Sequence, residues 1–146
     1  MNIEIITKNL KLDIYGFGSI ATSKDYVGTA FKLSGKMWEV VKTNRLPNKG
    51  MNIWVYDSDD KVFAGIELEN NIGTDNVELE RMAINLEKYA YFKHIGSYNL
   101  IKQTGKNMTS ELTRRGFEVM LPYIEIYGHW TNEESKLETE LLMCIK

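Results

Sequence analysis

The sequence LPYIEIYGHW, residues 121–130, alternates between apolar side chains and polar or aromatic ones. Successive side chains of a strand point to opposite faces, so its two isoleucines share one face while Tyr123, Glu125 and Tyr127 share the other. A carboxylate between two phenol rings is suited to holding a cation, because it attracts the charge and each ring adds about 0.5–2 kcal/mol in a sheltered site. A strand with one face in solvent would show the same alternation. The interpretation as a cation site therefore holds only if this face is shielded from water.

Upstream of this strand, two further runs alternate in the same way and are joined by a loop of hairpin length. They are MNIWVYD (51–57) and VFAGIEL (62–68). We expect the first run to place Trp54 and Tyr56 together on one face of the sheet. We expect the second run to place Phe63 on that same face. The three rings are therefore candidates for the walls of one site.

Two helices are predicted from apolar residues that recur at three- and four-residue spacing. The first covers about 24–44, and its stripe includes Val27, Phe31 and Trp38 as expected core residues. The second begins after Ser97, which is a suitable N-cap residue.

Along the sequence, the predicted strands precede and follow each helix in a repeated order. Extended runs are expected at 3–7, 11–21, 51–57, 62–68, 79–84, 87–95, 122–128 and 138–146. The order β-α-β-β therefore occurs twice, and Trp54 of the first copy corresponds to Glu125 of the second. Short hairpin loops join the strands after each helix, so the fold class is α+β with an antiparallel sheet.

We predict a single effector-binding domain over 1–146, built from two pseudo-symmetric halves at about 1–70 and 77–146 and joined by the polar loop 69–77. Both helices are expected on one side of the sheet, with a ligand groove on the other side. In that arrangement, a Glu125 carboxylate turned toward the helices would rule out the groove.

Composition limits the classes of function. The 18 basic and 20 acidic residues nearly balance, which argues against direct contact with nucleic acid. No apolar run approaches the length of a membrane span, so no membrane association is predicted. The single cysteine, Cys144, cannot form an intramolecular disulfide, and the N-terminus lacks the apolar run of a signal peptide. We therefore expect a cytoplasmic protein.

Familiar cofactor and metal motifs are absent or out of context. His94 and His129 have no cysteine or acidic partner at ligand spacing, so we predict no metal site. Gly16 and Gly18 match the letters of a dinucleotide motif, but the parallel β-α-β unit that this motif requires does not follow. No cofactor is expected.

Several stretches resemble the GyrI-like (gyrase-inhibitor-like) family, the effector-binding domain found behind AraC- and MerR-type DNA-binding domains and as a standalone protein. They are the segments KMWEVV, MNIWVYDSDDKVFAGIEL, YAYFKHIGSYNLI and PYIEIY. The resemblance implies tandem β-α-β-β units with a groove between them. It also implies that Glu125 lies at the base of an aromatic pocket for lipophilic, often cationic, drugs and dyes. The DNA-binding domain of the regulator members has no counterpart in this sequence, so transcription regulation would require a partner.

We expect a standalone protein that senses or sequesters a lipophilic cationic small molecule. The candidate ligand-binding residues are Glu125, Trp54, Tyr56, Phe63, Tyr89, Tyr91, Tyr123 and Tyr127. Trp130, just after the strand, is either a lid or a loop residue.

Two alternative functions remain open. In the first, the protein is a hydrolase of strained electrophiles, in which Glu125 activates a water and Tyr91 or Tyr127 donates a proton to the leaving group. In the second, the groove docks a protein partner, either a DNA-binding regulator or gyrase.

Overall fold

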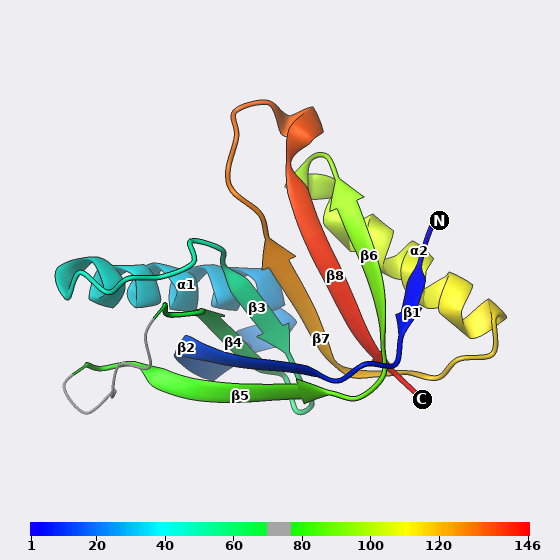
Figure 1. Cartoon of the computed structure of the whole chain (residues 1–146), viewed down its shortest axis with the longest axis horizontal. Coiled ribbons are helices and arrows are strands. Elements are labelled where there is room, and N and C mark those ends of the chain that lie inside the picture. The colour runs from blue at the N-terminus through cyan, green and yellow to red at the C-terminus, as the bar shows by residue number, and fades with distance from the viewer. Residues whose placement is uncertain (70–76) are drawn as a thin grey trace.

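A computed structural model describes residues 1–69 and 77–146. Within these ranges, eight strands form one antiparallel sheet that carries two helices (Figure 1), which confirms the α+β class. The strands are β1 (Glu4–Ile6), β2 (Leu10–Ile20), β3 (Ile53–Tyr56), β4 (Lys61–Ile66), β5 (Glu80–Leu86), β6 (Tyr89–Ile95), β7 (Val119–Tyr127) and β8 (Glu138–Ile145). The helices are α1 (Tyr26–Thr43) and α2 (Ile101–Arg114). The expected polar loop at 69–77 lies mostly outside the described residues.

The strand order is β1-β6-β8-β7-β3-β4-β2-β5, and every neighbouring pair is antiparallel. This order is symmetric about the β7–β3 junction. Each half supplies one β-α-β-β unit, which confirms the predicted repeat. The strand before each unit crosses to the other half, since β1 pairs with β6 and β5 pairs with β2. The two halves therefore share one continuous sheet.

Helix α1 packs on the sheet through Ala30, Met37 and Val41, which are almost fully buried. Val27 and Phe31 were expected on the same buried stripe, but they are 64% and 72% exposed, so that expectation is wrong. The apolar face of α1 is wider than the sheet beneath it can cover. One flank of the helix therefore presents apolar side chains to open space.

Helix α2 follows the 3₁₀ turn Tyr98–Leu100. Ser97, the expected N-cap of the helix, caps this turn with its side chain instead. The helix packs through Ile101, Met108 and Leu112, which are all buried. In the described residues, neither helix is long and apolar enough to cross a membrane.

The glycine pair Gly16 and Gly65 allows β2 and β4 to approach closely. A Cβ atom on Gly16 would lie only 1.9 Å from the Ala64 carbonyl oxygen, so no other residue fits there without a shift of the backbone. The close packing of β2 against β4 therefore explains the glycine at position 16 of the G-x-G pattern. Strand β2 runs through this region without a break.

Candidate ligand-binding site

The middle of the sheet forms the floor of the candidate site. Three pairs of side chains from β3 and its N-terminal extension face β7 on one face of the sheet: Tyr56 opposite Tyr123, Trp54 opposite Glu125, and Asn52 beside Tyr127. The junction of β3 and β7 is the centre of the pseudo-symmetric sheet. Trp54 and Glu125, which occupy corresponding positions in the two halves, therefore meet at its axis.

Glu125 is buried at the centre of this floor, with 6% of its surface exposed. Three phenol groups donate hydrogen bonds to its carboxylate: Tyr123 to Oε2 at 2.8 Å, and Tyr127 and Tyr56 to Oε1 at 2.7 Å and 3.3 Å. None of the ion pairs in residues 1–69 and 77–146 includes Glu125. The carboxylate is therefore well hydrogen-bonded but has no basic side chain as a partner.

Burial keeps the three phenols in their protonated form. It is the largest cause that raises the pKa of Tyr56, Tyr123 and Tyr127 far above the usual value, and the charge of Glu125 and the hydrogen bonds to it add to the effect. Each hydroxyl can thus act as a donor to the carboxylate across the physiological pH range.

Two aromatic walls rise from the floor in a symmetric arrangement. The ring of Tyr26 meets Tyr56 edge-on, with centroids 6.3 Å apart, and Tyr98 meets Tyr127 in the same way at 5.4 Å; both pairs have an interplanar angle of 89°. Tyr26 is the first residue of α1, and Tyr98 begins the 3₁₀ turn that leads into α2. Trp54 adds to the second wall, because its ring centroid lies 4.8 Å from that of Tyr127.

The floor and walls belong to a groove of about 1740 Å³ between the two helices. Phe31 and Trp38 of α1 line one side, and Lys102, Gly105 and Thr109 of α2 line the other. The groove therefore lies on the helix face of the sheet, and our placement of it on the opposite face was wrong.

The Glu125 carboxylate faces the side of the sheet that carries the helices, but no helix covers it. Helix α1 packs on β2 and β4, while α2 packs near β6 and β7, so the centre of the sheet lies in the gap between them (Figure 1). The expectation that a Glu125 carboxylate turned toward the helices would rule out a groove is wrong, because each helix covers only its own half of the sheet and Glu125 lines the groove between them.

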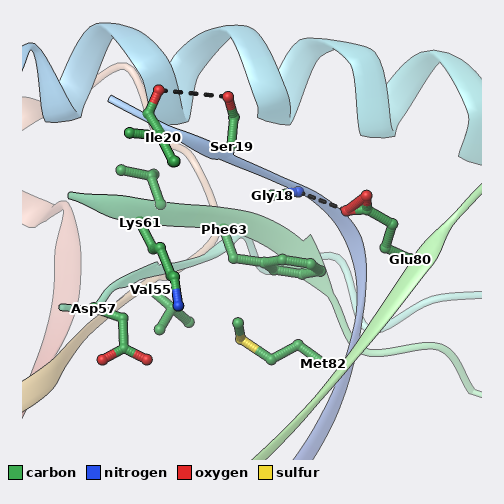
Figure 2. A pocket seen from close by; sticks show the side chains of 10 residues that line it. Gly18, Ser19, Ile20, Val55, Asp57, Lys61, Phe63, Glu80 and Met82 are labelled. Carbon is green, nitrogen blue, oxygen red and sulfur yellow. Dashed lines mark hydrogen bonds between the residues drawn. The ribbon is translucent and has the colours of Figure 1, made fainter. Parts of the chain in front are cut away.

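Phe63 lies on the opposite face from the groove, which corrects its predicted position. In the β3–β4 hairpin, Phe63 pairs with Val55, whereas Trp54 pairs with Ala64. Phe63 is 6% exposed and lines a separate hollow of about 270 Å³ with Val55 and Met82 (Figure 2). Strand β4 is buried on both faces, so its apolar pattern could not indicate which face carries Trp54.

Tyr89 and Tyr91 also lie on the face away from the groove. Tyr91 is paired with Leu142, and Leu142 is paired with Ile124, which is on the opposite face from Glu125. Tyr89 is buried in the core on that face, and Tyr91 packs against the same core. Burial is the main cause that raises the pKa of Tyr91, and Glu140 adds to the effect. The structure therefore brings neither tyrosine to Glu125.

Five of the eight predicted residues meet in the groove, and several lining residues were not predicted. The predicted ones are Glu125, Trp54, Tyr56, Tyr123 and Tyr127; the additional ones include Tyr26, Tyr98, Asn52, Phe31 and Trp38. Tyr26 and Tyr98 could have been found from the repeat, since each stands at the start of the helical segment of its half, at corresponding positions. Trp130, 74% exposed, also lines the groove at its mouth.

Solved structures with the same fold come from several kinds of protein. EcmrR, solved in a complex with DNA, is 12% identical, with a TM-score of 0.73, and the match covers 99% of this chain and 57% of EcmrR. SAV2435 bound to tetraphenylphosphonium is 14% identical, with a TM-score of 0.71, and the match covers 100% and 94%. A hydrolase from Listeria innocua is 11% identical, with a TM-score of 0.56, and the match covers 99% and 91%. At these identities the likeness establishes a shared fold.

Sequence comparison identifies the family. Among curated proteins, none matches this chain. The model of the GyrI-like small molecule binding domain matches residues 50–146, about two thirds of the chain. This range contains β3 and β7, which form the groove floor. The chain therefore belongs to the GyrI-like small molecule binding domain family.

Proposed function

We propose that this protein binds lipophilic cations in the groove between α1 and α2, with Glu125 as the counter-charge. The observation that carries the proposal is the environment of Glu125. Glu125 as a whole residue is 6% exposed, and no basic side chain among the described residues is paired with its carboxylate. A buried charge without an opposite charge is costly. A cationic ligand would supply the missing charge.

The hydrogen bonds to Glu125 favour a particular kind of cation. A carboxylate has about four acceptor positions, and the hydroxyls of Tyr56, Tyr123 and Tyr127 occupy three of them. A primary ammonium, which has three hydrogens to place, would compete with these phenols. A phosphonium or quaternary ammonium needs no acceptor and can rest against the ring faces. We therefore expect ligands whose charge is surrounded by apolar groups.

The size and charge of the groove support the same class of ligand. Its volume of about 1740 Å³ exceeds that of a typical drug pocket. The described lining includes five acidic side chains against three basic ones, and four of the five belong to the acidic rim formed by Asp25, Asp57, Asp59 and Asp60. This excess of negative charge would attract a cation toward the groove. SAV2435, which shares the fold, was solved with the lipophilic cation tetraphenylphosphonium.

The proposal can be tested with two ligands of similar shape and different charge. Methyltriphenylphosphonium is cationic and triphenylphosphine oxide is neutral, and both can be titrated while the fluorescence of the groove tryptophans is followed. We expect Glu125→Gln to weaken binding of the cation by about 100-fold, since an effective dielectric constant near 20 gives about 3 kcal/mol at a separation of about 5 Å. Binding of the neutral ligand should change little.

A matched control separates the local charge from the net charge of the protein. Glu39→Gln, on the exposed side of α1 and outside the groove lining, makes the same change in net charge. It should leave the affinity for both ligands unaltered. Equal losses for the cation and the neutral ligand in Glu125→Gln would refute a counter-charge role.

A hydrolase remains a second candidate because the Tyr127 hydroxyl lies 2.7 Å from the Glu125 carboxylate. Glu125 would act on a water and Tyr127 would protonate the leaving group. Tyr91 has no place in this version, because it lies on the other face of the sheet. Incubation with a strained electrophile, followed by mass spectrometry, would distinguish the two candidates. More than one molecule of hydrolysed product per protein molecule would favour the hydrolase.

A further inference from the structure

The orientation of the Asn52 side chain is set by its contact with α1. Its Oδ1 atom accepts a hydrogen bond from Trp38 Nε1 at 2.6 Å and a second from Ser34 Oγ at 3.3 Å. The indole N–H of Trp38 can only donate, so the oxygen of the amide, and not its nitrogen, must face the helix. The NH₂ group of Asn52 is consequently turned away from Trp38.

The hydrogens of this NH₂ group have no acceptor among residues 1–69 and 77–146, and Asn52 lines the groove. Asn52 is itself only partly buried, and its nitrogen keeps some contact with solvent. Two residues further on, the indole N–H of Trp54 is fully buried without an acceptor in the described part of the chain. A donor that has no partner in the protein favours a ligand that brings an acceptor. The β3 side of the floor therefore offers donors, while the β7 side offers the anion.

This division breaks the symmetry of the two halves. Asn52 lies two residues before Trp54, and Tyr123 lies two residues before Glu125, so the two side chains occupy corresponding places. Tyr123 uses its hydroxyl to bind Glu125 at 2.8 Å. Asn52 instead is held by the helix of its own half. Of the two corresponding floor positions, the one on the β3 side therefore carries an amide that can contact a ligand.

We propose that the Asn52 amide is a specificity-determining subsite, which selects lipophilic cations that carry a carbonyl or similar acceptor at a distance from the charge. The inference rests on the proposed function and names the second chemical group that the ligand should have. Asn52 and Glu125 are diagonal neighbours across the β3–β7 pair, which sets their Cα atoms about 7–8 Å apart. Trp38 acts as a positioning residue for the amide.

Two phosphonium ligands of equal charge and similar size provide the test. (4-Acetamidobenzyl)triphenylphosphonium carries a carbonyl acceptor, and (4-isobutylbenzyl)triphenylphosphonium replaces it with hydrocarbon. The quantity measured is the ratio of their dissociation constants by calorimetry, because charge and ring contacts cancel in that ratio. In ¹⁵N-labelled wild-type protein, the side-chain NH₂ signals of Asn52 should shift with the acetamide ligand and not with its hydrocarbon counterpart.

Two variants examine the amide and its support. Asn52→Asp keeps an oxygen for Trp38 and Ser34 but removes the NH₂ donors. It should therefore weaken binding of the acetamide ligand about tenfold relative to binding of the hydrocarbon ligand. Trp38→Phe keeps the amide but removes the bond that orients it, and should move the ratio in the same direction. Glu39→Gln, on the exposed side of α1 and outside the groove lining, is the control and should leave the ratio unchanged.

The outcomes separate this inference from the proposed function. If Glu125→Gln weakens both phosphoniums but Asn52→Asp leaves their ratio at the wild-type value, the groove binds cations and the amide subsite is wrong. If the NH₂ signals of Asn52 respond equally to both ligands, the subsite is also wrong. If neither phosphonium binds the wild-type protein, both the subsite and the cation-binding function fail.

Discussion

The three phenols around Glu125 lead us to a quantitative prediction about the stability of the protein at high pH. An unfolded tyrosine ionises near pH 10, whereas burial first and the charge of Glu125 second raise the pKa of Tyr56, Tyr123 and Tyr127 in the folded protein. Above pH 10, the unfolded chain therefore binds fewer protons than the folded one. The free energy of unfolding should then fall by about 1.4 kcal/mol per pH unit for each phenol, or about 4 kcal/mol for the three. Below pH 10 their contribution should be fully present.

Replacing Tyr127 by phenylalanine should change both the level and the slope of this dependence. At pH 8 the variant loses a hydrogen bond to a charged group, which should cost about 1.5–3 kcal/mol. Above pH 10 its stability should fall less steeply than that of the wild type, by about 1.4 kcal/mol per pH unit. The two stability curves should therefore converge roughly one to two pH units above pH 10.

Urea unfolding followed by circular dichroism at pH 8, 9, 10, 10.5 and 11 would measure these slopes. Glu125→Gln is a useful second variant, since it removes the charge but leaves the burial that dominates the shift. Its slope should stay close to the wild-type value. Equal slopes for wild type and Tyr127→Phe above pH 10 would refute the reasoning, because they would mean that the Tyr127 phenol ionises in the folded protein as freely as in the unfolded chain.

Three further predictions concern other parts of the structure. Tyr91→Phe should leave the calorimetric affinity for methyltriphenylphosphonium within about twofold of wild type, because the side chain is on the far face of the sheet; a tenfold loss would contradict this placement. Phe31→Ser should weaken binding of methyltriphenylphosphonium about threefold to tenfold, since the ring lines the groove. Its stability in thermal unfolding should stay within about 0.5 kcal/mol of wild type, since the ring is 72% exposed. Gly16→Ala should lower the free energy of unfolding in urea by about 3 kcal/mol, because its Cβ would meet the Ala64 carbonyl; an unchanged value would show that β2 and β4 can separate at little cost.

The sequence alone was sufficient for the class of fold and for the grouping of Tyr123, Glu125 and Tyr127 on one strand face. The spacing of apolar residues predicted both helices, and the alternation in residues 121–130 predicted that Tyr123, Glu125 and Tyr127 share a face. The structure places these three side chains on one face, where both phenols donate to the carboxylate. Such patterns are local: helical spacing and strand alternation follow from the backbone geometry of a few consecutive residues.

The tertiary structure decided which other residues join Glu125. Phe63 was placed on the wrong face because β4 is buried on both sides, and only the pairing of Val55 with Phe63 shows which way the ring points. The position of the groove likewise depends on where each helix packs along the sheet, and the Asn52 amide is oriented by Trp38 from α1. Strand register and helix placement are set by contacts between segments far apart in the chain, which alternation within one strand cannot specify.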